Sequence, residues 1–394
     1  MLRTSVWKRY AIEFNASSKP TVGVEWELQL LDPITLDLID GIMPLMEFFP
    51  NAGFVKPEYI QSCVELNSCV AESSDMAIAH IHGTLTQLLR RCAELKMDAC
   101  GSGTHPFCRR LALITPLPRY QRIEKHVGHL AHTQITFSTH VHIGMRSGDE
   151  AMRVMSLLAP ALPAFIALSA NSPFWRGHET GHAAYRHRIL AAAPSYSLPP
   201  NLRNWAEFED LMRAALHAGV ARSIKDIHWD IRPHPDFGTL EIRAMDAASD
   251  LITLHALVAF ARSLALCLRD APVEDVGEIL PPNLPHWIAK ENRFRAAHLG
   301  LAADYIIDKK GNLRPLNELI ADLIEYCSPT AASAGEAAGL ELAKDLLAGA
   351  AGYERQLQAY EQSHSPPSVV NMLTDALRSS SIEETFTKGQ LLTH

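Results

Sequence analysis

The stretch TVGVEWELQLLD, residues 21–32, alternates apolar and polar residues, which is typical of a half-buried β-strand. Its apolar face carries Val22, Val24, Trp26, Leu28 and Leu30. The opposite face carries Glu25 and Glu27 side by side. Glutamate is a poor strand former, and two like charges on one face of a sheet repel each other. The pattern therefore indicates a strand whose two adjacent carboxylates need an explanation, which the polar faces of the other strands help to give.

The composition of the 394 residues is that of an ordinary globular protein, with 47% hydrophobic and 20% charged residues. The net charge is −8, and the sequence has no basic block or basic-aromatic stripe. We therefore expect no nucleic-acid partner, because binding to phosphates needs clustered lysines and arginines.

Targeting and redox signals favour a soluble cytoplasmic protein. The N-terminal stretch lacks the apolar core of a signal peptide, and the longest apolar run, residues 157–170, is too short to span a bilayer and contains two prolines. We therefore expect no membrane partner. The seven cysteines are odd in number and form no CxxC pair, so we expect reduced thiols in the cytoplasm.

Hydrophobic periodicity predicts a mixed α+β fold. Strand-like alternation occurs at residues 21–31, 59–67, 134–145 and 237–246. Helical patterns occur at residues 75–101, 149–171, 204–218, 248–270, 313–326 and 333–362. Strands and helices do not alternate one for one, which favours an antiparallel sheet with helices packed behind one face and the other face open.

The domain organisation expected from this pattern is simple. A lead-in over residues 1–20 precedes a single domain over residues 21–380, whose portion from about residue 291 is helical. Residues 381–394 form a polar tail. The polar sequence that follows SHSPPS (363–368) is expected to be loosely attached.

Polar groups recur on one face of the other predicted strands. The third strand offers Ser138, His140 and His142, and the fourth offers Thr239, Glu241 and Arg243. The second offers Glu65, with Glu58 at its start. Two carboxylates about 4 Å apart repel by roughly 4 kcal/mol at an effective dielectric constant near 20. Such a face needs cations, and oxygen ligands with one imidazole favour Mg²⁺ or Mn²⁺.

Divalent cations beside an arginine suggest phosphoryl transfer from a nucleotide. The sequence has no Walker GxxxxGK[ST] motif, so ATP would bind without a P-loop. A rival signal is HETGH (178–182), which matches the HExxH signature of zinc hydrolases. Gly177 and Gly181 interrupt it, and no apolar helical period supports the helix that this signature requires.

Taken together, the motifs resemble the type 2 glutamate–cysteine ligase family, whose members are carboxylate–amine ligases. The resemblance runs from about residue 20 to about residue 310. It rests on VGVEWELQLLDP (22–33), VELNS (64–68), GTHP (103–106), HVHIG (140–144), ALSANSPFWRG (167–177), YRHR (185–188), WDIRPHPDFGTLEIR (229–243) and ENRFRA (291–296). It implies a glutamine-synthetase-like catalytic fold, in which the open face of an antiparallel sheet holds ATP and metals.

The resemblance also implies roles for individual residues. The implied metal ligands are Glu25, Glu27, Glu65, His140 and Glu241, with Glu58 as a further candidate. His142 would lie nearer the nucleotide phosphates, and Arg243, with help from Arg232, would contact the transferring phosphoryl group. The implied substrate residues are Arg186 for an amino-acid carboxylate, and Asn171, Ser172 and Arg176 in the loop beside it.

The function implied by the resemblance is an ATP- and Mg²⁺-dependent ligase. It would form an amide through an acyl phosphate, from small-molecule amino-acid and amine substrates such as glutamate and cysteine. The alternatives are a phosphotransferase on the same fold, a zinc hydrolase that uses HETGH, and a non-catalytic nucleotide-binding descendant. We expect a homodimer, because an open sheet often buries an edge or its helical back by self-association.

Overall fold

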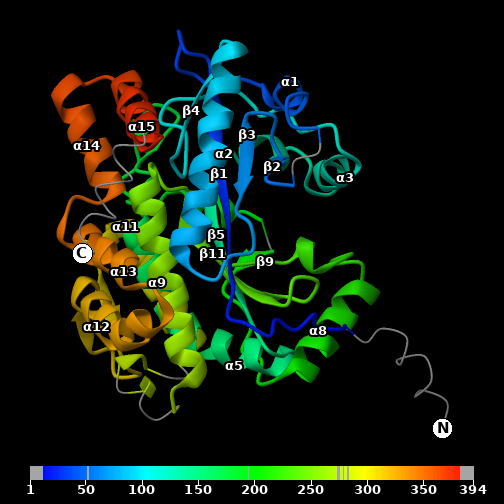
Figure 1. The fold of residues 1–394 in the computed structure, drawn as a ribbon, viewed down its shortest axis with the longest axis vertical. Coiled ribbons are helices and arrows are strands. Elements are labelled where there is room, and N and C mark those ends of the chain that lie inside the picture. The colour runs from blue at the N-terminus through cyan, green and yellow to red at the C-terminus, as the bar shows by residue number, and fades with distance from the viewer. Residues whose placement is uncertain are drawn as a thin grey trace.

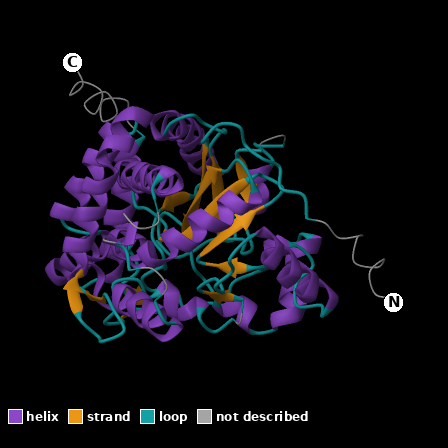
Figure 2. Ribbon diagram, turned by 90° about the horizontal axis from the view of Figure 1, so that it is seen from below, coloured by secondary structure: helices purple, strands orange, loops and turns teal. Residues whose placement is uncertain are grey.

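A computed structural model describes residues 12–50, 53–193, 195–272, 276–277, 279–281 and 284–381 (Figure 1). Most of the predicted polar tail, residues 382–394, and the first part of the predicted lead-in, residues 1–11, lie outside the described residues. The fold is α+β, as predicted. A central antiparallel sheet runs through the middle of the molecule, and the larger group of helices lies on one side of it (Figure 2).

The central sheet has seven strands in the described part of the chain, in the order β10-β11-β5-β1-β3-β2, and β4 pairs with Gln29–Leu31 of β1 beyond the end of β5. Every pair in it is antiparallel. The strands are β1 Val22–Leu31, β2 Val55–Pro57, β3 Cys63–Asn67, β4 Asp98–Cys100, β5 Ser138–Gly144, β10 Ile231–His234 and β11 Thr239–Asp246. The strand that opens the sequence argument, β1, therefore lies at the centre of the sheet.

Helices cover the apolar face of this sheet. Trp26 on β1 is fully buried, as are Val141 on β5 and Ile242 on β11. The helices α2 (Ser74–Glu94), α5 (Gly148–Leu158) and α9 (Leu251–Asp270) pack against these strands. Figure 1 shows α2 lying across β1 and β3 with α9 beside it. Burial of this face supplies the main hydrophobic core.

Helix α6 (Leu162–Ser169) also packs against the sheet, at β11. A second layer lies outside these helices: α12 (Leu316–Ala334) and α13 (Ala337–Ala348) pack against α9, and α11 (His286–Leu299) packs against α6. Helices α14 (Gly352–Ser363) and α15 (Pro366–Ser380) follow them in the chain. Other α-helices are α1 (Ile42–Met46), α3 (Pro118–Val127), α4 (Leu130–Thr133), α7 (Arg186–Leu190) and α8 (Trp205–His217). Three small two-stranded sheets pair β6 (Phe174–Trp175) with β7 (His178–Glu179), β8 (Tyr196–Ser197) with β9 (His228–Trp229), and β12 (Asp304–Ile306) with β13 (Leu313–Pro315).

Three predicted element boundaries differ from those in the structure. The helix predicted at 75–101 ends at Glu94, because Lys96 adopts a positive φ and the chain turns into β4, which pairs with β1. The helix predicted at 149–171 is interrupted by a 3₁₀ turn at Ala159–Ala161, which contains Pro160. The strand predicted at 59–67 begins at Cys63.

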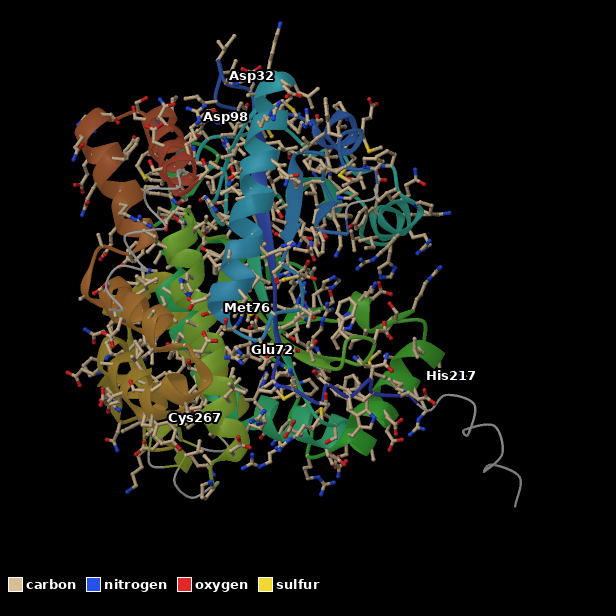
Figure 3. All side chains as sticks on the ribbon, viewed as in Figure 1. Asp32, Glu72, Met76, Asp98, His217 and Cys267 are labelled. Carbon is tan, nitrogen blue, oxygen red and sulfur yellow. The ribbon has the colours of Figure 1, made fainter. Side chains whose placement is uncertain are left out.

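The C-terminal helices also differ from the prediction. Residues 333–362 form two helices, and the pattern at 313–326 begins with a short strand before α12. The expectation of a loosely attached segment after residue 368 is wrong for the part of it in α15, where four apolar side chains are buried: Val369, Val370, Leu373 and Leu377. Arg378 of this helix also forms an ion pair with Asp98 of β4, which Figure 3 labels near one end of the molecule.

Two helical stretches, Gly148–Ser169 and α9, are long and apolar enough to cross a membrane by length and composition. Within each of them, 78% of the most apolar window is buried inside the protein. Buried core helices of globular proteins meet the same criterion, so these stretches are weak indications of a membrane span.

We expect the substitution Trp26→Ala to lower the free energy of unfolding by about 3–5 kcal/mol. Trp26 is fully buried, and its indole Nε1 donates a hydrogen bond of 3.0 Å to the carbonyl oxygen of Ala248. Urea denaturation followed by circular dichroism measures the change. Trp287, which is 59% exposed, is the matched control, and Trp287→Ala should change stability by less than about 0.5 kcal/mol. A loss below about 1 kcal/mol for Trp26→Ala would contradict the central position of this side chain.

Candidate active site

The strand register places the predicted site residues together on the polar face of the sheet. Glu25 on β1 lies opposite His140 on β5, and Glu241 on β11 lies opposite His142 on β5. Arg232 on β10 lies opposite Glu241 in turn. Because cross-strand partners share a face, four adjacent strands contribute charged groups to one patch.

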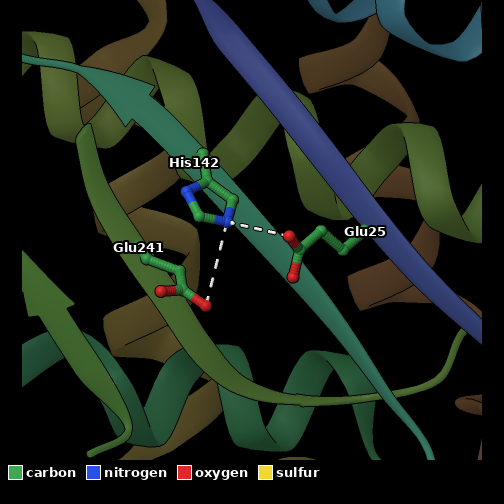
Figure 4. A group of neighbouring side chains, drawn as sticks. All are labelled: Glu25, His142 and Glu241. Atoms are coloured by element: carbon green, nitrogen blue, oxygen red, sulfur yellow. Dashed lines mark ion pairs between the residues drawn. The ribbon is translucent and has the colours of Figure 1, made fainter. Parts of the chain in front are cut away.

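Glu25, His142 and Glu241 form a cluster that could hold a metal ion, since one ligand atom of each lies within 4.8 Å of the others. Figure 4 shows the three side chains pointing toward one another from β1, β5 and β11. His142 Nε2 lies 3.5 Å from Glu25 Oε1 and 3.8 Å from Glu241 Oε1. The ring is oriented by a 2.9 Å hydrogen bond between His142 Nδ1 and Thr239 Oγ1.

The donor set fits a divalent cation. His142 Nε2 is buried, has no hydrogen-bond partner and faces two carboxylates. Two carboxylates and one imidazole suit Mg²⁺ or Mn²⁺. Burial opposes ionisation of Glu25, but its hydrogen bond with His140 and the nearby His142 ring hold its carboxyl pKa well below the usual range. Burial also disfavours the charged form of His142, but the Glu241 carboxylate raises the pKa of the ring.

His140 was predicted as the ligand and His142 as the residue nearer the phosphates, but the structure places His142 in the cluster. His140 Nδ1 lies 3.1 Å from Glu25 Oε2 and 3.3 Å from an Arg243 nitrogen, while its Nε2 lies 2.9 Å from Ser138 Oγ. Burial and the neighbouring Arg243 lower the pKa of His140 to about 4, so the ring is neutral at physiological pH. The division of roles between the two histidines remains a prediction.

Glu241 is buried between two arginines. Arg232 donates to it through Nε at 2.7 Å and through Nη2 at 3.3 Å, and Arg243 forms a second ion pair with it. Burial opposes ionisation, but Arg232 and Arg243 hold the carboxyl pKa of Glu241 well below its usual range. The third nitrogen of Arg232 donates to the carbonyl oxygens of Ile224 and Ile227, so each of the three guanidinium nitrogens is engaged. Arg243 is therefore the better placed of the two to contact a substrate.

A second acidic group adjoins the cluster. Glu27 on β1 lies opposite Glu65 on β3, and Glu58 lies just before this strand. Burial raises the pKa of all three carboxyl groups, and the charge of Glu27 adds to the effect at Glu58. Glu27 accepts a hydrogen bond from the amide of Ser138, and Glu65 accepts one from Asn67 and lies 3.8 Å from the Lys56 ammonium. A cation bound beside these three carboxyl groups would favour their ionised forms.

Of the predicted substrate residues, Arg186 has buried donor groups without partners. Arg186 at the start of α7 is 4% exposed, and its Nε and Nη1 have no hydrogen-bond partner. Asp246 Oδ1 lies 3.9 Å from Nη1 and is also without a hydrogen-bond partner. Burial lowers the pKa of Arg186, and Asp246 and Glu27 oppose this shift. A buried guanidinium with free donors is suited to bind a carboxylate.

The structure does not direct the other three predicted substrate residues toward the cluster. Asn171 donates to the carbonyl oxygens of Gly101 and Ala247, and Ser172 Oγ donates to Asp246 Oδ2 at 2.6 Å. These two side chains thus hold the loop in place. Arg176 lies over the ring of its neighbour Trp175, with the guanidinium carbon 5.6 Å from the ring centroid.

Sequence reasoning missed Asp246 and Gln356. A register shift between Ile242 and Met245 places Asp246 opposite Ser138, on the polar face of the sheet, where strict alternation would point it into the core. Gln356 on α14 is buried and donates to both side-chain and backbone oxygens of Asn171. The bulge in β11 has no distinct sequence signal, and Gln356 is remote in sequence from the loop that it holds.

The rival HETGH motif does not form a zinc site of the HExxH type. His178 and Glu179 are exposed residues of the short strand β7, and Gly181 has a positive φ of 70°. The two histidines therefore do not lie on one helical turn, as this metal-binding motif requires.

An antiparallel sheet with acidic residues, histidines and arginines on one face, backed by helices, fits the class of carboxylate–amine ligases. Comparisons with known proteins agree with this class. The sequence profile of glutamate–cysteine ligase family 2 (GCS2) matches residues 21–372, so the chain belongs to this family, whose members are ATP-dependent ligases.

Named relatives extend over nearly the whole chain. A candidate glutamate–cysteine ligase 2 of Trichormus variabilis is 40% identical over 366 residues, which is 93% of this chain and 95% of the relative. Another candidate glutamate–cysteine ligase 2, of Thermobifida fusca, is 34% identical over 374 residues and covers 93% of both chains. This length of alignment includes the sheet and the helices behind it.

Two solved structures share the fold. The crystal structure of a glutamate–cysteine ligase from Francisella tularensis in complex with AMP superimposes with a TM-score of 0.66 at 12% identity, covering 93% of this chain and 89% of that one. A bifunctional glutathione synthetase from Pasteurella multocida superimposes with a TM-score of 0.63 at 12% identity and covers 93% of this chain and 53% of that one. At this identity the likeness concerns the fold alone.

We expect Mn²⁺ to bind the isolated protein and Glu25→Gln to weaken this binding at least about ten-fold, because one anionic ligand is lost. Electron paramagnetic resonance of free Mn²⁺ measures the affinity. Glu318→Gln, an exposed carboxylate on α12, is the matched control and should leave the affinity unchanged. Equal affinities in all three proteins would exclude the cluster as the metal site.

The same binding should depend on pH. Burial disfavours the charged form of His142, but Glu241 raises the pKa of the ring above its ordinary value, so a proton competes with the metal for the ring up to a higher pH than at an ordinary histidine. Mn²⁺ affinity should therefore increase as the pH rises through this pKa and fall as the pH drops below it. Affinities that are flat between about pH 5.5 and about pH 8 would argue against His142 as a ligand.

Proposed function

We propose that this ligase joins the γ-carboxylate of glutamate to the amine of cysteine, using ATP and Mg²⁺. The observation that carries the proposal is the cluster of Glu25, His142 and Glu241 beside Arg243 on the polar sheet face of a family member. The relatives named as candidate glutamate–cysteine ligases support the choice of substrates. The AMP complex of the Francisella tularensis enzyme supports nucleotide binding on this fold.

In this proposal the cluster and the acidic group beside it hold Mg²⁺, with Glu25, Glu241 and His142 as ligands and Glu27, Glu58 and Glu65 as further candidates. Bound Mg²⁺ neutralises phosphate oxygens and orients the triphosphate. The acidic residues in turn keep the cation on one face of the sheet, within reach of Arg243. His140 retains its contacts to Glu25 and Arg243 and orients both side chains.

The proposed reaction has two steps. The glutamate γ-carboxylate oxygen attacks the γ-phosphorus of ATP, the bond from this phosphorus to the bridging oxygen breaks, and ADP leaves with that electron pair. The cysteine amine then attacks the acyl carbon, loses a proton, and expels inorganic phosphate to form the amide. Arg243 stabilises the charge on the transferring phosphoryl group, and Arg186 binds a substrate carboxylate. Arg232 acts through Glu241, which it holds in place.

No protein nucleophile takes part in these steps. All seven cysteines are free thiols, and burial raises the pKa of Cys63 and Cys100, which makes thiolates at these positions unfavourable. Free thiols also suit a reducing compartment, which supports a cytoplasmic location in this proposal.

The direct test measures ADP release with ATP and Mg²⁺ over a matrix of amino acids and amines, with products identified by mass spectrometry. We expect ADP release to need both glutamate and cysteine and to yield a new amide mass. Glu241→Gln should reduce turnover at least about 100-fold, because Arg232 and Arg243 lose their shared carboxylate and the metal loses a ligand. Glu318→Gln also removes a carboxylate and is the control, which should leave turnover unchanged.

Two outcomes would overturn parts of the proposal. ADP release without an amide product would replace the ligase by a phosphotransferase. Full activity in Glu241→Gln, with an unchanged melting temperature, would exclude the polar sheet face as the reaction centre.

The substrate role of Arg186 has its own test. Arg186→Lys should raise the KM for the amino-acid carboxylate at least about ten-fold, because an ammonium cannot replace the bidentate guanidinium. The affinity for ADP, measured by calorimetry, should not change. Arg188→Lys, on the exposed side of the same helix, is the matched control. A KM increase for ATP instead would place Arg186 on the nucleotide side.

A further inference from the structure

The turn between β10 and β11 carries an exposed aromatic ring beside the candidate metal cluster. Phe237 is 54% exposed, although its ring is held in a defined position. The ring stacks in parallel on buried His234, with centroids 4.1 Å apart and an interplanar angle of 8°. Its edge also meets the His142 ring, with centroids 5.7 Å apart.

The surrounding contacts place this ring on the polar face of the sheet. His234 lies opposite Thr239 in the β10–β11 pair, and Thr239 shares a hydrogen bond with His142. The turn itself is held by Asn15, whose Nδ2 donates to the carbonyl oxygen of Asp236. Gly238 has a positive φ of 64° and lies so close to the backbone of Asn15 that a side chain would clash with it. One face of Phe237 is therefore packed, and the ring retains a large exposed surface.

A single exposed apolar residue is ordinary on a protein surface. Phe237 differs because it touches His142, whose Nε2 faces Glu25 and Glu241. A row of contacts thus leads from the ring of Phe237, through the imidazole of His142, to the carboxylate of Glu241. Both Arg232 and Arg243 bind this carboxylate. A nucleoside triphosphate has the matching order, with a flat base at one end and charged phosphates at the other.

A second stacked pair is formed by Tyr196 and His228, with ring centroids 4.6 Å apart. Burial raises the pKa of Tyr196, and the charges of Arg243 and Arg186 oppose this shift, so the ring lies within electrostatic reach of both arginines. Phe237, in contrast, contacts the ring of His142 in the candidate metal cluster.

We propose that the exposed face of Phe237 stacks against the adenine ring of ATP and so orients the triphosphate toward Glu241 and Arg243. This assignment rests on the proposed function, because it takes ATP as the nucleotide. Stacking on an aromatic side chain contributes about 1–3 kcal/mol per base as judged by alanine substitution, which corresponds to a roughly 5- to 150-fold change in affinity.

The test compares the binding of two probes, ADP and inorganic tripolyphosphate, each with Mg²⁺, by isothermal titration calorimetry. We expect Phe237→Ala to raise the Kd for ADP about 5- to 150-fold and to leave the Kd for tripolyphosphate, which has no base, unchanged. Phe237→Trp should retain ADP affinity because an aromatic face remains. The matched control is Phe54→Ala: Phe54 is 44% exposed and packs edge-on against His80, which lies on α2.

The outcomes separate this proposal from the proposed function. Unchanged ADP affinity in Phe237→Ala, with normal wild-type binding, would overturn the stacking role and leave the ligase assignment standing. Loss of ADP affinity in Tyr196→Ala but not in Phe237→Ala would move the base to the other stacked pair. Absence of binding of both probes to the wild-type protein would overturn the nucleotide site itself. Equal weakening of both probes in Phe237→Ala would show a general disturbance of the turn and would also overturn the proposal.

Discussion

The candidate site depends on the burial of Glu241 between Arg232 and Arg243. Glu241 is 1% exposed, and an ion pair this deep is costly to form unless every charged group has a partner. The guanidinium nitrogens of Arg232 donate to Glu241 and to two backbone carbonyl oxygens. Arg243 is therefore the arginine at the edge of this group of charged residues. This arrangement fixes the position of a carboxylate that also faces His142 and Glu25. The fixed charge of Glu241 therefore acts on the charged groups around it on the polar face.

The acidic residues divide into two groups with opposite behaviour. The pKa values of Glu25 and Glu241 are held low, the first by histidines and the second by arginines, despite their burial. Burial instead raises the pKa values of Glu27, Glu58 and Glu65, and the charges of neighbouring carboxylates add to the effect at Glu58 and Glu65. A cation that binds between the two groups would therefore reduce the repulsion between their carboxylates. Both the charges and the geometry of the polar face thus suit a bound cation.

Distant parts of the chain hold the substrate side of the site. The loop at Asn171 and Ser172 is tied to β11 through Asp246 and to α14 through Gln356. The adjoining helix α15 is in turn anchored to β4 by Arg378 and Asp98. Helices α14 and α15 therefore contribute contacts to this loop and to the sheet, although none of the quoted sequence motifs lies in them. The match to the family profile extends to residue 372, within α15.

The sequence by itself determined the α+β class and the alternating face that collects Glu25, Glu27, His140, His142 and Glu241, because a strand's period of two fixes which side chains share a face. Family resemblance added roles for the arginines, and these remain proposals. Tertiary structure alone decided that His142 completes the cluster, that a bulge turns Asp246 toward the site, and that Asn171 is held by Gln356. These features depend on cross-strand register and on contacts between residues far apart in the chain. Local periodicity carries no information about either, since it describes each strand without its neighbours.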